Sequence, residues 1–466
     1  SNVLGKDLLN KIGYKKGIIY GLLISVVGAL LIIPSANANS FPAILASFFV
    51  VALGFSLQQT AAQPFAISLG DPSTGSHRLN LGGSINSLGT TLGPIIVSFF
   101  LFGTANSKTV KVDVSNINVL YMIVAGVFAA VALFFTFSNL PDGKNDEAFE
   151  KANKASSSLL MMSLLIGAII VVGQFTEVSK LTLLLISLVA VVGVLFYSNN
   201  SAIKNNDGWG AMKYPQLIYG MIGIFVYVGV EVTIDNNFGA LLKIPGYLTA
   251  KGLDESAISK YISLYWGSLM IGRWTGAISV FNLKGTLKTV MMVVVPFIAF
   301  GVVLGVSQIY GNDVSDLYGY AAFIAIALAA FFYGQEKPVK TLLAVSVLAA
   351  ACMLVGVFTN GIVSVYAFMA GGLCCSVMWP CIFSLSVAGL GKYTSQGSAF
   401  LIMMILGGAI IPPLQGAIGD MPAVGMHQSY LLAAAGFLFL AYLALKQKAV
   451  LKTQGIDFDA QVSGGH

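Results

Sequence analysis

Charged side chains are scarce in this sequence. Asp, Glu, Lys and Arg make up 9% of its 466 residues, whereas a soluble globular domain carries about 25%. With so few charges, and with 56% hydrophobic residues, the chain cannot cover a folded core with a wetted surface. Its composition therefore excludes a soluble protein and indicates an integral membrane protein.

Cysteine and histidine are also rare, with 4 and 3 residues. The cysteines fall in apolar runs without metal-ligand spacing or a nearby histidine, so we interpret them as small core residues. The histidines fall in predicted loops or in the tail. With no catalytic triad or metal cluster at membrane depth, the sequence argues against an enzyme, and we expect neither a metal site nor a cofactor.

Long apolar runs are abundant. Crossing the hydrocarbon core of a bilayer takes about 20 apolar residues in a helix, and lipid leaves a single spanning segment no other regular structure. Windows of that length predict an all-α polytopic protein with about 14 spans. They lie near residues 17–33, 41–69, 79–103, 117–140, 157–173, 180–198, 214–242, 258–280, 288–308, 317–333, 340–358, 361–388, 396–418 and 428–446.

The distribution of positive charge predicts the orientation. With residues 1–16 inside the cell and alternating spans, the outside segments hold only six of the 25 Lys and Arg residues. This bias follows the positive-inside rule and places the C-terminus in the cytoplasm. The net charge of +6 thus reports topology, and we expect no nucleic-acid partner.

Polar segments divide the chain into four parts. Residues 1–140 form a predicted N-terminal helical half, and residues 141–213 form a cytoplasmic linker that contains an inserted helical hairpin. Residues 214–446 form the C-terminal half, with further inserted spans within 288–358. Residues 447–466 are a polar cytoplasmic tail.

Two stretches of the chain repeat each other. Gln63-Pro64-Phe65 is followed by Leu88-Gly89-x-x-x-x-Pro94, and Trp379-Pro380 by Leu406-Gly407-x-x-x-x-Pro412. Duplicated pairs of spans are typical of transporters built from two related halves. Chance similarity between glycine-rich apolar segments is the alternative interpretation.

Several motifs, in chain order, resemble the fucose–glucose/galactose:proton symporter family of the major facilitator superfamily. They are QTAAQPF at 59–65, RLNL at 78–81, NSLG at 86–89, YVGVE at 227–231, YWG at 265–267 and GLGKYTSQGS at 389–398. In the fucose-transporting branch the position of Gln59 is a glutamate and that of Gly83 a glutamine. These two departures favour the glucose/galactose branch.

The resemblance implies a fold of twelve core helices in two pseudo-symmetric halves. The basic segment around Gly13, Lys15 and Lys16 is similar to the loop after the second helix of that superfamily. We therefore expect that the first two core helices are missing from the sequence. The 14 spans would then be ten core helices and two inserted pairs.

Only two of the 19 carboxylates fall well inside an apolar span. Glu231 and Asp235 lie four residues apart, which stacks them on one helix face. A buried charge is costly unless it meets water, a partner or a cation, and repulsion favours a proton on one of two neighbouring acids. We predict cation coupling at Glu231, the acid of the family motif, and at Asp235. For Asp235 the alternative is a tilted span that brings it to the outer interface.

Polar amides mark a candidate sugar site. Gln59 and Gln63 lie one turn apart before Pro64, Asn86 lies on the next span, and Asn236 follows the acids. Amides donate and accept, which suits sugar hydroxyls. Buried amides also bridge helices without binding anything, and this remains the alternative.

Aromatic rings complete the predicted pocket. Tyr227, Tyr265, Trp266 and Trp379 are near span midpoints or at positions that face the pocket in the family, where flat rings stack on a sugar. Packing or interfacial anchoring is the alternative. Trp379, beside the proline of the repeat, is the ring we assign to substrate binding.

The two arginines, Arg78 and Arg273, fall at predicted cytoplasmic ends of spans. A gate that closes across the cytoplasmic face, with Asp71 as a partner, is one interpretation. Ordinary positive-inside anchoring is the other.

Together these features predict a monomeric symporter of the bacterial inner membrane, surrounded by lipid, that takes up a hexose with H⁺ by alternating access. Na⁺ is the alternative coupling ion. The alternative functions are transport of another small polar solute and a membrane sugar sensor or scaffold subunit that does not transport.

Overall fold

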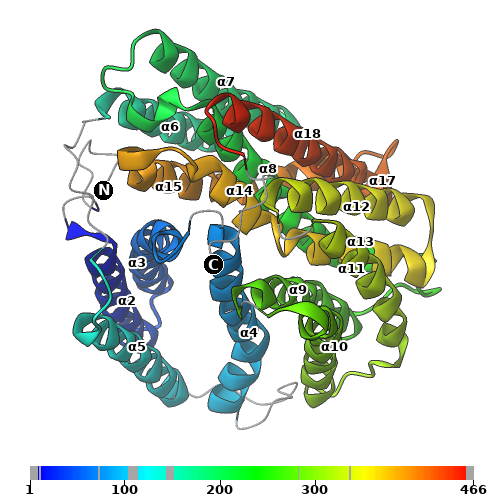
Figure 1. Ribbon diagram of the computed structural model, residues 1–466. Helices are drawn as coiled ribbons and strands as arrows, with labels where there is room; N and C mark the ends of the chain where they lie inside the picture. Colours follow the sequence, from blue (N-terminus) through cyan, green and yellow to red (C-terminus); the bar gives the residue numbers. More distant parts are fainter. Residues whose placement is uncertain are drawn as a thin grey trace.

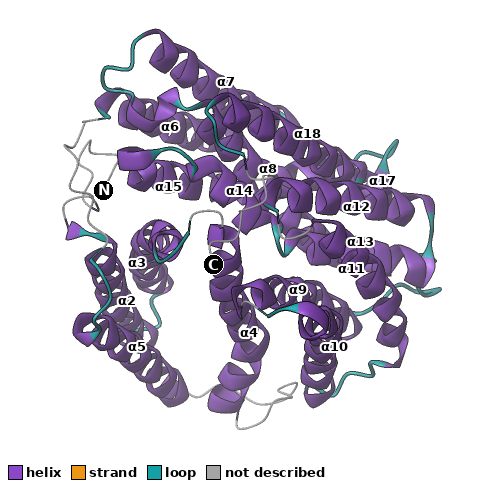
Figure 2. Cartoon of the chain, in the orientation of Figure 1, coloured by secondary structure: helices purple, strands orange, loops and turns teal. Residues whose placement is uncertain are grey.

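The computed structural model describes residues 9, 12–71, 74–102, 114–142, 152–281, 283–334 and 337–457. These residues form helices joined by short loops, and none of them lies in a strand (Figure 2). The predicted all-α fold is confirmed. Residues 143–151 of the predicted linker and 458–466 of the predicted tail lie outside the described residues.

The first helices form a group with a small core of its own. They are α2 (Tyr14–Asn37), α3 (Phe41–Ser68), α4 (Gly75–Phe102) and α5 (Val114–Phe137). Helix α2 packs most extensively against α3 and α5 (Figure 1). Leu22, Ala61 and Phe65 are among the side chains buried in this core.

The predicted inserted hairpin is present as α6 (Asn153–Phe175) and α7 (Lys180–Lys204). Leu159 and Met162 of α6 and Val191 and Leu195 of α7 are buried and belong to the main hydrophobic core. Helix α7 packs against α8 and α16 of the C-terminal helices. The hairpin therefore adds to the C-terminal core and not to the core around α2.

The remaining helices surround α8. They are α8 (Pro215–Leu242), α9 (Glu255–Ala277), α10 (Gly285–Ile309), α11 (Ala321–Gly334), α12 (Pro338–Phe358), α13 (Gly361–Cys375), α14 (Met378–Val387), α15 (Thr394–Met403), α16 (Gly407–Gly419), α17 (Gly425–Ser429) and α18 (Leu431–Thr453). In the apolar window of α8, 83% of the residues are buried, against 11% for α3. Most of α8, including the middle of the helix, is thus enclosed by protein.

Twelve helical segments among the described residues are long and apolar enough to cross a membrane. The chain is therefore a multi-pass membrane protein. Helices α4 and α9 have 28 and 23 residues but are not among the twelve. The number of about 14 spans, and the division of the chain at 140, 213 and 446, stay predictions.

The second copy of the repeated motif is interrupted where the first is continuous. Pro64 lies inside the unbroken helix α3. Pro380 lies in the first turn of α14, after a break that separates α14 from α13. A proline is tolerated in a first turn, because the backbone N–H groups there have no partner within the helix.

The two groups of helices meet mainly where α4 packs on α9 and where α3 packs on α15 (Figure 1). Trp274 Nε1 donates to the carbonyl oxygen of Ser84 at 3.3 Å, and Ser398 Oγ donates to that of Thr60 at 3.0 Å. The first contact joins the first half of α4 to the second half of α9, and the second joins α15 to α3. The charge distribution predicts that these parts of α4 and α9 lie on the cytoplasmic side.

Candidate functional site

Glu231 lies near the middle of α8 and is 8% exposed. Its Oε1 accepts a hydrogen bond from the Tyr227 hydroxyl, one turn earlier, at 2.9 Å. Its backbone oxygen accepts from the Tyr265 hydroxyl of α9 at 2.6 Å. Tyr227 thus holds the carboxyl group and Tyr265 the backbone of Glu231, inside one of the two most buried spanning segments of the described residues.

Arg273 of α9 contacts the same carboxyl group. Its Nη2 is 3.8 Å from Glu231 Oε1, and its Nη1 donates to Ser87 Oγ of α4 at 2.7 Å. We expected Arg273 at the cytoplasmic end of its span. The structure places its backbone one turn before the end of α9, and its long side chain extends to the acid. The pair gives the buried charge of Glu231 the partner that an intramembrane acid requires.

Trp379 is half-buried beside this cluster. Its ring centroid is 6.2 Å from that of Tyr227 and 6.2 Å from that of Phe383. The ring that the sequence analysis assigned to substrate binding is therefore next to the tyrosine that donates to Glu231. A molecule in contact with Trp379 would thus be separated from Glu231 by the side chain of Tyr227.

Asp235 is also on α8, one turn beyond Glu231, and is half-buried. Trp266 of α9 lies close to its carboxyl group, whereas Oδ1 is buried without a hydrogen-bond partner. The pairing of Glu231 and Asp235 on one helix face is as expected, but their partners differ. Glu231 faces a cation and Asp235 an indole.

Asn236 is exposed, whereas its neighbour Asn237 is half-buried and forms hydrogen bonds between helices. Asn237 Nδ2 donates to Gln415 Oε1 at 2.9 Å and to the Pro412 carbonyl at 3.2 Å. Gln415 in turn donates to Ser429 at 3.0 Å. This buried chain ties α8 to α16 and α17, and the sequence analysis missed it.

The predicted amide cluster lies apart from Glu231. Gln59 and Asn86 are exposed on α3 and α4, while Gln63 is half-buried with its Oε1 enclosed and without a partner. Among the described residues, no hydrogen bond links these three amides to the Glu231 cluster.

Arg78 holds a turn together. It donates to the carbonyl oxygens of Ala66 and Ile67 at 2.6 Å each and of Asp71 at 2.8 Å, and to Thr74 Oγ1 at 2.7 Å. All of these acceptors lie on the end of α3 or in the turn before α4. The side chain thus caps α3, and the gating role assigned to Arg78 stays a prediction.

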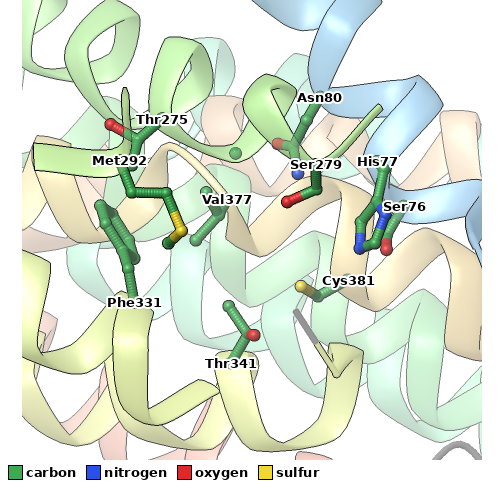
Figure 3. Close-up of a pocket in the computed structure, with 11 residues that line it drawn as sticks. Ser76, His77, Asn80, Thr275, Ser279, Met292, Phe331, Thr341, Val377 and Cys381 are labelled. Carbon is green, nitrogen blue, oxygen red and sulfur yellow. The ribbon is translucent and has the colours of Figure 1, made fainter. Parts of the chain in front are cut away.

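A small cavity lies where α4 meets α9, toward the predicted cytoplasmic face (Figure 3). Its volume is about 40 Å³, and its polar walls are Ser76, His77 and Asn80 from α4 with Thr275 and Ser279 opposite. That volume has room for a few water molecules. Among the described residues, no cluster of His, Cys, Asp or Glu suits a metal ion.

A family model decides the class of the protein. Residues 1–336 match the model of the Major Facilitator Superfamily. The chain belongs to this superfamily. It is a membrane transporter and not an enzyme, as the sequence motifs predicted.

Similar proteins cover nearly the whole chain. The glucose/galactose transporter of Brucella abortus is 28% identical over 439 residues, which are 94% of this chain and 80% of that protein. The L-fucose-proton symporter of Escherichia coli is 24% identical over 418 residues, 89% of this chain and 74% of that protein.

A solved structure confirms the fold. The fucose:proton symporter of Escherichia coli superposes with a TM-score of 0.65 at 20% identity, covering 96% of this chain and 87% of that chain. At this identity the likeness supports the arrangement of helices alone. The predicted superfamily fold is confirmed, and the roles of individual residues rest on this chain's own geometry.

Proposed function

We propose that this protein is a symporter of the bacterial inner membrane that takes up a glucose- or galactose-like hexose with a proton. The observation that carries this proposal is Glu231. An acid enclosed in the central helix, held by Tyr227 and compensated by Arg273, has the surroundings of a group that exchanges a proton. The names of the similar transporters support both the sugar and the proton.

The sugar would bind between the two groups of helices. Trp379 offers a flat ring beside Tyr227, while Gln59 and Gln63 of α3 offer amides that can donate and accept. Asn86, Asn236 and Asp235 would complete the polar wall. A monomer surrounded by lipid, with its C-terminus in the cytoplasm, is the form in which we expect it to work.

Alternating access is supported by the contact between the helix groups. In this structure α4 and α9 pack together at their predicted cytoplasmic ends. Substrate would therefore enter from the opposite side, and uptake would require α4 and α9 to separate. Rocking of two halves around a central site is the usual mechanism of transporters built from repeats.

The test is transport by the full chain in proteoliposomes. Imposed proton or sodium gradients would be compared as drivers of accumulation of radiolabelled glucose, galactose and fucose. We expect a proton gradient to drive glucose or galactose accumulation. Accumulation driven by sodium alone would show that the coupling ion is Na⁺ and not H⁺. Asp235 would then be the next residue to test as its binding site. Tight sugar binding without flux would instead favour a sensor.

Replacing Trp379 with Ala is expected to weaken sugar binding. A stacked ring contributes about 0.5–1.5 kcal/mol beyond its area burial, so the KM of uptake should rise about threefold to tenfold. Trp379→Phe keeps a flat ring and serves as the matched control, with a KM near that of the wild type. Equal KM values for all three proteins would remove Trp379 from the site.

A further inference from the structure

The guanidinium group of Arg273 lies between the two groups of helices. It is 3.8 Å from the carboxylate of Glu231 on α8 and donates to Ser87 Oγ on α4 at 2.7 Å. Glu231 is 8% exposed and Ser87 1%. One side chain therefore connects the proposed proton site of the C-terminal helices with a buried hydroxyl of the N-terminal helices.

The stem of Arg273 is fitted closely to α4. A Cβ atom added to Gly83 would lie 3.3 Å from Arg273 Cδ, and one added to Gly276 would lie 2.8 Å from Asn80 Nδ2. The next residue, Trp274, donates to the carbonyl oxygen of Ser84 on α4. Arg273 thus belongs to the α4–α9 contact and is enclosed only while the two helices remain together.

The charge of Arg273 is tolerated in this contact because Glu231 compensates it. A buried ion pair that loses the charge of one partner leaves the other uncompensated, and this is strongly unfavourable. Protonation of Glu231 would have that effect. The neutral Ser87 hydroxyl remains as an acceptor, but it carries no negative charge.

We propose that Arg273 transmits the protonation state of Glu231 to the contact between α4 and α9. With Glu231 ionised, the half-buried guanidinium group stays on Ser87 between α4 and α9, and the predicted cytoplasmic side stays closed. With Glu231 protonated, the uncompensated guanidinium group favours separation of α4 from α9, which gives it access to water. This inference rests on the proposed function, because it takes Glu231 as the proton site.

Other titratable groups also surround the Glu231 carboxyl group. Tyr227 faces it from α8, Tyr265 and Arg273 from α9, and Cys375 from α13. Of these, only Arg273 also hydrogen-bonds a residue of α4 in the described structure. Arg273 is therefore the group through which protonation of Glu231 would affect the packing of α9 on α4.

The separation of the helices can be measured as a distance between two spin labels on the full chain in liposomes. Leu69 and Phe281, which are 46% and 62% exposed, lie at the ends of α3 and of the 3₁₀ turn η4 (Ile278–Phe281) that follows α9. Replacing each with Cys places one label on each helix group. The four native cysteines are buried, and unsubstituted protein controls for their labelling.

Acidification is expected to add a longer distance in the wild-type background. Glu231→Gln should show the longer distance at neutral pH as well, with an open-to-closed ratio raised about tenfold to hundredfold, because the guanidinium group loses the compensating charge 3.8 Å away. Arg273→Gln should keep the short distance at both pH values. The double variant should also return to the short distance, since no uncompensated charge remains.

A purely structural role for Arg273 predicts the opposite. Arg273→Gln would then lengthen the distance by itself, and the double variant would be at least as open as Glu231→Gln; either result overturns the proposal. Arg273→Lys, which keeps the positive charge, should retain the response to pH, and a loss of that response in a folded protein would contradict the proposed role of charge.

Two serines of α4 provide a matched pair. Ser87→Ala removes the acceptor for Arg273 and should raise the open fraction at neutral pH. Ser84→Ala should not, because Ser84 Oγ donates to Leu81 within its own helix and its backbone oxygen still accepts from Trp274. Equal effects of the two substitutions would contradict the role of the Arg273–Ser87 bond.

Uptake by the same variants separates this inference from the proposed function. If the wild type shows no proton-driven accumulation, the proposed function fails. If Glu231→Gln keeps proton-driven accumulation, symport stands, but the proton site lies elsewhere and this inference fails with it. If Glu231→Gln loses accumulation but the double variant stays open, the proton site stands and only the role of Arg273 fails.

Discussion

Glu231→Gln is expected to abolish proton-driven sugar accumulation while sugar counterflow continues. A gradient of about one pH unit stores about 1.4 kcal/mol, which supports about a tenfold sugar gradient at one proton per sugar. Without a residue that exchanges the proton, the internal sugar concentration should only reach the external one. Counterflow exchanges sugar for sugar and needs no net proton movement, so it should survive.

The substitution keeps the hydrogen bonds that residue 231 accepts from the two tyrosines. The amide oxygen of a glutamine can still accept the Tyr227 hydrogen bond that Glu231 Oε1 accepts at 2.9 Å, and the Tyr265 bond goes to the backbone oxygen. The side-chain volume is nearly unchanged. Loss of coupling with retained counterflow would thus report the missing proton and not a damaged sugar site.

Asp207→Asn is the matched control, since its side chain is 86% exposed beside Lys154. It removes a carboxylate of the same kind outside the membrane and should leave accumulation at the wild-type level. Accumulation by Glu231→Gln equal to that of this control would move the proton site elsewhere. Loss of both accumulation and counterflow would show that Glu231 also shapes the sugar site.

The acid was predictable from sequence, whereas its partner was not. A carboxylate inside an apolar span is visible in any hydropathy window, and this singled out Glu231. Arg273 is on another helix, and its distance from Glu231 depends on how α8 and α9 pack and on the reach of a long side chain. No spacing in the sequence contains that information.

The asparagines show a second limit of sequence reasoning. Asn236 and Asn237 are adjacent and chemically identical, but one residue along a helix turns the side chain by about 100°, since 3.6 residues make one turn. Asn237 thereby meets Gln415, while Asn236 is exposed. Because this helix is mostly apolar on all sides, its sequence does not indicate which of the two asparagines faces the protein interior.

The repeated motif is a third case, because its two copies are similar in sequence and differ in packing. Leu88-Gly89 and Leu406-Gly407 occupy matching positions. A Cβ atom added to Gly407 would lie 1.8 Å from the carbonyl oxygen of Phe225, whereas one added to Gly89 would have no atom within 4 Å. Only the second glycine is required for close contact between two helices.

Gly407→Ala is therefore expected to destabilise the protein severely, and Gly89→Ala is not. The obstacle at Gly407 is backbone, which no change of rotamer relieves, so α16 must move away from α8. Overpacking a core costs typically 1–3 kcal/mol, and a backbone clash should reach about 3 kcal/mol or more. At Gly89, alanine has free space and gains up to about 1 kcal/mol of helix propensity.

The measurement is the melting temperature in detergent together with the monodisperse fraction on size exclusion, for both variants and the wild type. Gly407→Ala should lower both, and Gly89→Ala should leave them unchanged or slightly higher. Movement of α16 would also disturb Asn237, which donates to Gln415 and to the carbonyl oxygen of Pro412 on α16. Equal stability of the two variants would contradict the α8–α16 packing, and with it the enclosure of the helix that carries Glu231.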